Sequence, residues 1–193
     1  MENIAFVLGN GTSRLVLDLE QLKKTGTVYG CNAIYREFIP HILVSTDPGI
    51  SQEIQDSGYA LHNTHYTRKP LAGKGSKKIE YNYGFSSGPV ALTYAAKSDA
   101  ERIYFAGFDL TGIDGMINNV YAGTQHYKES NTSETYYGNW VNQIEKIMKS
   151  CPKKRFIRLV QPGVHTPTTW MTTNYSEMPI ADFLLWINKL NPR

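Results

Sequence analysis

Ile4-Ala5-Phe6-Val7-Leu8 is a continuous apolar run that changes at once into the polar sequence Gly9-Asn10-Gly11-Thr12-Ser13. A short apolar run that stops at glycine is typical of a buried strand followed by a loop. In open α/β sheets, ligands bind beyond the carboxyl ends of the strands, and the first such loop commonly holds a nucleotide. The glycines would let backbone N–H groups approach a ligand closely. The beginning of the chain therefore predicts a nucleotide site.

Beyond this strand, short apolar runs alternate with helical patterns, which indicates βαβ units and a mainly parallel sheet. Strands are expected at 3–8, 27–31, 41–46, 59–63, 101–106 and 155–160. Helices are expected at 15–24, 50–57, 88–98, 134–150 and 179–190. The prediction is one α/β domain over residues 1–193, a Rossmann-like three-layer sandwich with a short lid after the fifth strand.

Two of the expected helices carry further signals. The helix at 88–98 follows Ser86-Ser87-Gly88 and has Pro89 just inside, which marks a helix start. The helix at 134–150 has Ser133 as a candidate N-cap. Its apolar residues recur at helical spacing: Tyr137, Trp140, Val141, Ile144, Ile147 and Met148. Such a stripe predicts contact with the core and not a binding surface.

Composition narrows the functional class. The 193 residues are 41% hydrophobic and 19% charged, as expected of a globular domain. The net charge of +3 suits anionic ligands but falls short of a nucleic-acid-binding surface. Cys31 and Cys151 are too few for a disulfide framework or a zinc site, and Cys31 is expected to pack in the core. No apolar stretch approaches the roughly 20 residues of a membrane span, so a cytoplasmic location is expected. Assembly into a homo-oligomer is possible on this composition.

Two long segments have no regular pattern, and loops of such length are usually functional or mobile. Residues 110–133 are rich in Gly, Asn, Thr and Tyr and form the expected lid. Residues 64–84 contain the basic side chains Arg68, Lys69, Lys74, Lys77 and Lys78. These basic residues are interpreted either as a solvated loop or as a phosphate clamp.

Polar clusters stand at the ends of the predicted strands and at one helix start. They are Gly9–Ser13, Gly30-Cys31-Asn32, Ser45-Thr46-Asp47-Pro48, Ser86-Ser87-Gly88 and Gly107-Phe108-Asp109. Each cluster alone is compatible with a structural turn. Parallel strands would bring all of them to one edge of the sheet, and this convergence favours a binding site.

The chemistry of these clusters suits a nucleotide. Ser87 and Gly88 at a helix N-terminus would offer unpaired N–H donors to a phosphate. The amides of Asn10 and Asn32 could read a base or a sugar. Asp47 and Asp109 could bind ribose hydroxyls, or share a magnesium ion if they lie close together. The full set of expected nucleotide-binding residues is Gly9, Asn10, Gly11, Thr12, Ser13, Asn32, Asp47, Ser86, Ser87, Gly88 and Asp109.

Histidines are the candidates for acid–base chemistry. His126 lies in the lid beside tyrosines, and His165 follows the sixth expected strand. His41, His62 and His65 lie in or beside expected strands and are interpreted as structural.

These motifs resemble a bacterial family of sialyltransferases of the lipooligosaccharide type, which use CMP-sialic acid. They also resemble the related hydroxymethyldihydropterin pyrophosphokinase-like family. The first family has Gly-Asn-Gly-Pro-Ser after its first strand, then Cys-Asn, Asn-Pro-Ser, Thr-Ser-Gly before a helix, and Gly-Ile-Asp. The counterparts here are Gly9–Ser13, Cys31-Asn32, Asp47-Pro48-Gly49, Ser86-Ser87-Gly88 and Gly107-Phe108-Asp109. The likeness covers most of this chain in outline, and this chain is shorter.

The resemblance implies a Rossmann-like sheet with a lid that binds a cytidine nucleotide through Asn10, Asn32, Ser87 and Gly88. In such enzymes a lid histidine deprotonates the acceptor hydroxyl, and two tyrosines stabilise the leaving phosphate without a metal. Asp47 in place of Asn resembles the pyrophosphokinase-like branch, which would use ATP and magnesium.

The catalytic set implied by the resemblance is incomplete here. Aligning the lid His-Tyr with His126-Tyr127 puts Ser130 where the family has its base. Thr111 stands at one tyrosine position, and Tyr121 would supply the other. His126, Tyr121 and Tyr127 are therefore the catalytic candidates.

Three functions remain as hypotheses. The first is a sialyltransferase-like glycosyl transfer from a nucleotide-activated donor to a hydroxyl, with no cofactor. The second is magnesium-dependent diphosphate transfer from ATP. The third is nucleotide binding without catalysis. Each predicts a nucleotide or nucleotide-sugar partner and no nucleic acid, and none specifies the acceptor.

Overall fold

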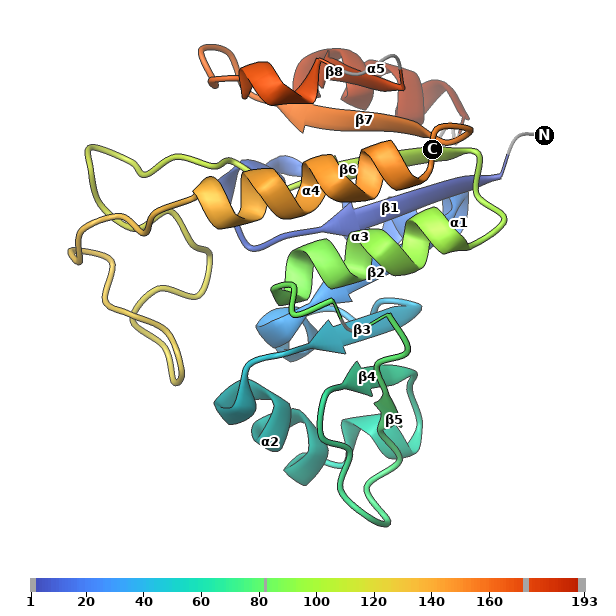
Figure 1. The fold of residues 1–193 in the computed structure, drawn as a ribbon, viewed down its shortest axis with the longest axis vertical. Coiled ribbons are helices and arrows are strands. Elements are labelled where there is room, and N and C mark those ends of the chain that lie inside the picture. The colour runs from blue at the N-terminus through green and yellow to red at the C-terminus, as the bar shows by residue number, and fades with distance from the viewer. Residues whose placement is uncertain (1–2, 82, 172–173, 191–193) are drawn as a thin grey trace.

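The computed structural model describes residues 3–81, 83–171 and 174–190 of the chain. Its centre is a sheet of eight strands in the order β5-β4-β3-β2-β1-β6-β7-β8, and every neighbouring pair is parallel (Figure 1). The strands are β1 (Ile4–Leu8), β2 (Thr27–Cys31), β3 (Ile42–Ser45), β4 (His65–Thr67), β5 (Lys77–Lys78), β6 (Arg102–Ala106), β7 (Arg155–Val160) and β8 (Tyr175–Pro179). The expected Rossmann-like α/β fold with a mainly parallel sheet is confirmed.

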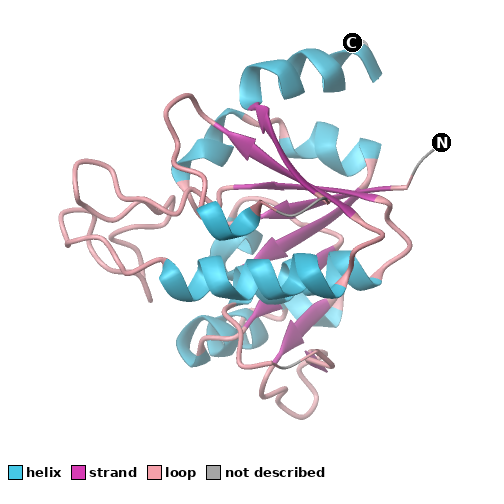
Figure 2. Ribbon diagram, turned by 45° about the horizontal axis from the view of Figure 1, so that its top comes forward, coloured by secondary structure: helices cyan, strands magenta, loops and turns pink. Residues whose placement is uncertain are grey.

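Helices cover both faces of the sheet, as Figure 1 and Figure 2 show. One face carries α3 (Ser87–Lys97) and α4 (Gly138–Ser150), and the other carries α1 (Leu19–Thr25), α2 (Pro48–Asp56) and α5 (Ile180–Leu190). Alternate residues of each strand enter the two cores: in β1, Val7 faces α3 while Phe6 faces the opposite layer. None of the helices in the described ranges is long and apolar enough to span a membrane.

The order of the strands reverses beside β1. The chain adds β2 to β5 outward on one side, then returns through α3 and places β6 on the other side of β1. In doubly wound sheets such a reversal opens a crevice beyond the carboxyl ends of the strands, where ligands bind. The topology therefore puts a candidate site beyond Leu8 and Ala106, the last residues of β1 and β6.

The prediction of a strand at 59–63 is wrong. Gly58, with a φ of 77°, follows α2, and Tyr59–Leu61 form a 3-10 helix. The ring of Tyr59 packs edge-on against Tyr35 with centroids 5.4 Å apart, so this stretch belongs to the helical layer. The actual strands β4 and β5 lie within 64–84, which was expected to be irregular. They are only three and two residues long, too short to show a period in the sequence.

The helix expected at 134–150 begins later, at Gly138, and Tyr137 is its N-cap in place of Ser133. Ser133 instead forms an isolated β-bridge with Met116, so it belongs to the loop before the helix. The helix expected at 15–24 is also shorter, since α1 begins only after its N-cap Asp18. β8 was not foreseen, because its side chains are mostly exposed and do not form an apolar run.

His65 in β4 is a buried, hydrogen-bonded side chain of the fold. Its burial predicts how the stability of the fold depends on pH. Its side chain is fully buried, with Nε2 2.7 Å from Ser45 Oγ and Nδ1 2.8 Å from Ser76 Oγ. Burial lowers the pKa of His65 to about 4. Between about pH 6.5 and pH 4 the unfolded chain therefore binds a proton that the folded chain does not, so acid destabilises the fold.

We expect His65 to account for a loss of roughly 2–3 kcal/mol of unfolding free energy between pH 7 and pH 4.5. Urea unfolding of the wild type and of His65→Gln at both pH values measures this contribution as the difference between their pH dependences. His62→Gln is the matched control, because His62 is exposed. Equal pH dependence in wild type and His65→Gln would show that His65 is not the titrating group.

Candidate functional site

The polar clusters that follow the strands meet at one pocket. Every cluster contributes to its lining, which includes Gly9, Asn10, Gly11, Cys31, Asn32, Asp47, Ser86, Ser87, Gly88, Gly107, Phe108 and Asp109. The pocket has a volume of about 190 Å³. Pockets that enclose a drug-sized ligand commonly measure roughly 300–1,000 Å³, so a whole nucleotide would extend beyond this one. The pocket lies where the strand order reverses, at the β1–β6 boundary.

The N-terminus of α3 forms one wall of the pocket. Ser87 Oγ accepts a hydrogen bond from the Thr46 amide at 2.9 Å, which ties the helix to the end of β3. The Ser86 amide donates to Gln143 Oε1 on α4 at 2.9 Å. The amides of Ser87 and Gly88 belong to the first helical turn and have no acceptor within the helix. Together with the helix dipole they suit an anion such as phosphate.

Asp109 joins three parts of the site. Its carboxylate accepts hydrogen bonds from the amide and hydroxyl of Ser13, and from Asn118 Nδ2 at 3.0 Å. The side chain is consequently engaged in holding the β1 loop and the lid to the end of β6. Nowhere in the described ranges do three or more His, Cys, Asp or Glu side chains gather as metal ligands would. This geometry gives no support to Asp109 as a magnesium ligand.

The glycines after β1 serve a different purpose from the expected one. The amides of Gly9 and Gly11 donate to the carbonyls of Ala106 and Gly107, both at 2.8 Å, so they are not free to bind a ligand. A Cβ on Gly9 would lie 2.4 Å from the Gly107 carbonyl oxygen, and one on Gly11 would lie 2.5 Å from Asp109 Oδ2. These glycines therefore allow two backbone segments to pack closely.

Thr12 and Ser13 also act within the protein. The amide and hydroxyl of Thr12 donate to Asn118 Oδ1 at 2.9 and 2.8 Å, and Ser13 holds Asp109. Neither residue is among those that line the pocket. Of the expected nucleotide-binding residues, these two are placed behind the pocket wall.

Three polar side chains at the pocket have few hydrogen-bond partners within the protein: Asn10, Asn32 and Asp47. Asn32 has a φ of 53°, and its buried Oδ1 finds no hydrogen-bond partner within the described part of the chain. Its Nδ2 lies 3.5 Å from Asp47 Oδ2. Asp47 is exposed and, although it is the N-cap of α2, its side chain does not cap the helix. A buried amide oxygen without a partner is a group that a ligand N–H would satisfy.

Cys31 lines the pocket but is not a nucleophile. The side chain is buried, and its Sγ lies 3.4 Å from the Leu8 carbonyl oxygen. Burial raises the pKa of the thiol to about 12, so it stays protonated at neutral pH. The expectation that Cys31 packs in the core agrees with this environment.

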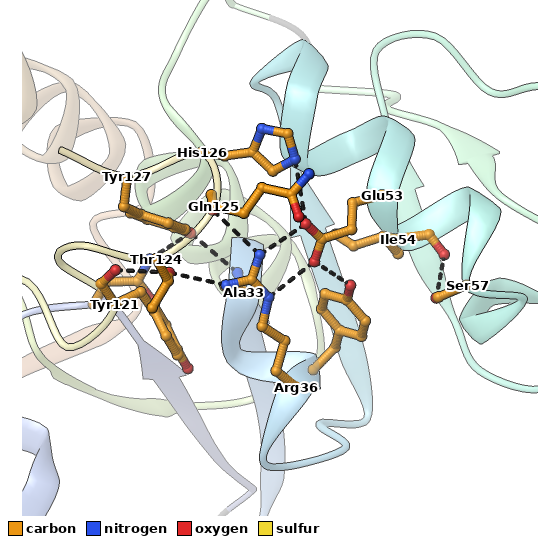
Figure 3. A network of polar contacts seen from close by, with 12 residues as sticks. Ala33, Arg36, Glu53, Ile54, Ser57, Tyr121, Thr124, Gln125, His126 and Tyr127 are labelled. Carbon is orange, nitrogen blue, oxygen red and sulfur yellow. Dashed lines mark hydrogen bonds and ion pairs between the residues drawn. The ribbon is translucent and has the colours of Figure 1, made fainter.

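The catalytic candidates lie beside the pocket, in the network drawn in Figure 3. His126 Nε2 is 3.2 Å from Glu53 Oε2 on α2, and Arg36 forms an ion pair with the same carboxylate at 2.8 Å. Arg36 also donates to Thr124 Oγ1 at 3.0 Å and to the Gln125 carbonyl at 3.2 Å. These contacts fasten residues 124 and 125 of the lid to Arg36, after β2, and His126 to α2.

The two tyrosines fasten the lid at other points. Tyr127 Oη accepts a hydrogen bond from the Ala33 amide at 3.2 Å, and Asn10 Nδ2 lies 3.5 Å from the same oxygen. Tyr121 Oη donates to Glu37 at 2.6 Å and accepts from the buried Arg14 at 2.7 Å. Burial raises the pKa of both tyrosines. His126, Tyr121 and Tyr127 are not among the residues that line the pocket.

Aromatic residues that the sequence assigned to the core line the pocket instead. Val141, Ile144, Ile147 and Met148 pack into the core beside α3, as expected. Tyr137 and Trp140, at the start of the same stripe, are half-buried and form part of the pocket wall. Their place in the first turn, next to the lid, was the one signal in the sequence that could have separated them from the rest.

The basic residues of 68–78 do not line the pocket. Lys74 pairs with Asp56 at 3.1 Å, Arg68 donates to the Phe85 carbonyl at 2.7 Å, and Lys77 lies over the Tyr66 ring. This segment belongs to the β5 edge of the sheet (Figure 1), and none of its residues lines the pocket. The placement agrees with a solvated loop and gives no support to a phosphate clamp.

Comparison with protein-family models, with curated proteins and with solved structures adds no relative. Nothing in any of the three matches this chain. The pocket itself and the order and spacing of its motifs are therefore the features that point to a function.

Proposed function

We propose that this chain is a transferase that binds a nucleotide-activated donor in the pocket, with the donor phosphate at the N-terminus of α3. One observation carries the proposal: the polar segments after β1, β2, β3 and β6 line a single pocket together with that helix start. This is the position at which α/β sheets of this type bind nucleotides. The similarity of the motifs to sialyltransferases suggests a cytidine nucleotide as the leaving group.

Different walls of the pocket would bind different parts of the nucleotide. The amides of Ser87 and Gly88 would hold the phosphate and stabilise the charge that grows on it as the donor bond breaks. The nucleoside would lie toward Asn10, Asn32 and Asp47. The unpartnered Oδ1 of Asn32 suits an exocyclic amine such as that of cytosine.

Transfer to a hydroxyl also needs a base for the acceptor proton. We propose His126 for this role. Its ring packs over Gly49, since a Cβ there would lie 2.6 Å from His126 Nδ1, and Gly49 is two residues from the pocket residue Asp47. Tyr127 is similarly one contact from the pocket, through Asn10. Tyr121 would act only by positioning the lid.

A nucleotide-binding protein without transfer is the second candidate. The observation in its favour is that His126, Tyr121 and Tyr127 are all engaged in contacts that hold the lid. Incubation with CMP-sialic acid and a mixture of hydroxyl acceptors separates the two functions. Release of CMP that slows in His126→Ala supports transfer, whereas binding without release of CMP supports the second function.

Thermal unfolding with CMP, CDP or ATP, with and without magnesium, tests nucleotide binding. A ligand at a hundredfold excess over Kd stabilises the fold by about 2.7 kcal/mol. We expect stabilisation by CMP that does not require magnesium. Stabilisation by ATP only with magnesium would favour diphosphate transfer, and no shift with any nucleotide would overturn the proposal.

Asn32→Gly is expected to weaken CMP binding about tenfold, the effect of losing one hydrogen bond to a ligand. Glycine keeps the positive φ of 53° without strain, so the fold should retain its stability. Titration calorimetry measures the affinity. The control is Asn131→Gly, which changes an exposed lid residue outside the pocket lining. Unchanged CMP affinity in Asn32→Gly would remove this side chain from the site.

A further inference from the structure

Tyr137 and Trp140 form an aromatic wall that the proposed nucleotide contacts leave unused. Both side chains line the pocket from the first turn of α4, and their ring centroids are 5.3 Å apart. Both are half-buried, and neither belongs to the clusters of core residues. Large aromatic side chains at a pocket wall provide flat apolar surface for a ligand.

The aromatic wall is held in place from two sides. The Tyr137 hydroxyl lies beside the backbone of Asn118 in the lid and near the Asp109 carboxylate. Burial is the main reason why the pKa of Tyr137 is raised. On the other side, Gln143 of α4 accepts the Ser86 amide at 2.9 Å, which ties α4 to the start of α3. The wall is therefore preorganised and not a pair of loose surface rings.

The position of the aromatic wall relative to the phosphate site indicates which part of the ligand would contact it. α3 and α4 begin on the lid side of the molecule (Figure 1). The start of α3 is bonded to α4 on one side, through Ser86 and Gln143, and to the end of β3 on the other, through Ser87 and Thr46. Asn32 and Asp47, after β2 and β3, form the amide and carboxylate side. Tyr137 and Trp140 on α4 form the aromatic side. A phosphate at α3 would direct its two substituents to these two sides.

We infer that Tyr137 and Trp140 form the subsite for the sugar ring of the transferred group, an inference that rests on the proposed function. A pyranose ring carries C–H groups on its faces, and these pack against the face of an aromatic ring. The base goes to the other side, because Asn32 and Asp47 there offer the hydrogen-bonding groups that distinguish bases.

The test compares two probes, CMP and CMP-sialic acid, by titration calorimetry. The wild type is expected to bind CMP-sialic acid more tightly than CMP. Trp140→Ala should weaken CMP-sialic acid binding roughly tenfold, in the range seen when one stacking ring is removed. CMP binding should stay within about twofold of the wild type. Trp140→Phe keeps a ring and should restore most of the preference.

Trp186→Phe is the matched control. Trp186 is also half-buried, but it stacks on Tyr104 with centroids 5.1 Å apart, in the core on the opposite face of the sheet. This variant should leave both affinities unchanged. A loss there equal to that in Trp140→Ala would mean that the effect is a general loss of stability, and it would overturn the inference.

The remaining outcomes separate the inference from the proposed function. A wild type that binds neither probe overturns the proposed function and the inference together. Equal weakening of CMP and CMP-sialic acid in Trp140→Ala would mean that the wall holds the base, and no weakening of either would mean that it holds nothing. Both of these results overturn the inference while leaving nucleotide binding intact.

Discussion

Replacing Arg158 by alanine is expected to lower the free energy of unfolding by about 4 kcal/mol, within the range for breaking a buried charged network. Arg158 lies in β7 and is 1% exposed. Its Nη2 donates to the carbonyls of Phe108 and Asp109 at 2.8 and 2.9 Å, and its Nη1 donates to the carbonyl of His165 at 3.1 Å. Alanine would leave the carbonyls of Phe108 and Asp109 buried without these donors and would open a cavity.

The same substitution should also disturb the pocket. Phe108 and Asp109 line it, and Arg158 fixes their carbonyls in position. Arg158→Lys would keep the charge but lose the planar fork that reaches several acceptors, so an intermediate loss is expected. The control is Arg155→Ala, an exposed arginine of the same strand. Urea unfolding measures all three variants, and a similar loss at positions 155 and 158 would contradict the role of the buried network.

Gly9→Ala is expected to destabilise the fold by roughly 3 kcal/mol, at the upper end of the range for overpacking. The added Cβ would lie 2.4 Å from the Gly107 carbonyl oxygen, a backbone atom that cannot turn away as a side chain can. The two loops would have to separate, and the hydrogen bond from Gly9 N to the Ala106 carbonyl at 2.8 Å would weaken. Stabilisation by CMP should be lost as well, because both loops line the pocket.

The matched control for Gly9→Ala is Gly115→Ala. Gly115 has a φ of 74°, but a Cβ there meets nothing within 4 Å. This variant therefore reports backbone strain alone, which costs about 1–2 kcal/mol. Urea unfolding should give a clearly larger loss for Gly9→Ala. If the two losses were equal, the close approach of the β1 and β6 loops would not be the cause.

The parts of the fold that were predicted well are those with strong local signals. β1 and β6 are buried on both faces and appear as continuous apolar runs, and α3 begins beside a glycine and a proline. β4 was missed because three residues contain no measurable period, and the apolar residues of 59–63 belong to a 3-10 helix. Short strands form because a neighbouring strand offers its backbone, which is not a property of their own residues.

The convergence of the polar loops on one pocket was predictable for the same reason. Parallel strands carry their ends to one edge, so Asn10, Asn32 and Asp47 reached the pocket as the topology required. The topology does not determine which side chains of each loop face the pocket. Thr12 turns to Asn118 in the lid, and His126 turns to Glu53 on α2. Such partners are more than 70 residues apart in sequence: Thr12 and Asn118 are separated by 106 positions.

The amino-acid sequence alone determined that this chain folds as a parallel α/β sheet and that its polar loops gather beyond the strand ends. It did so because strand burial and helix starts are local properties, and parallel topology then leaves the loops only one edge. The tertiary structure decided the roles of the individual residues: the glycines after β1 serve backbone packing, Asp109 serves as an anchor, and Tyr137 and Trp140 face the pocket. Those roles depend on which neighbour completes each hydrogen bond or covers each ring, and only the packed chain brings the neighbours together.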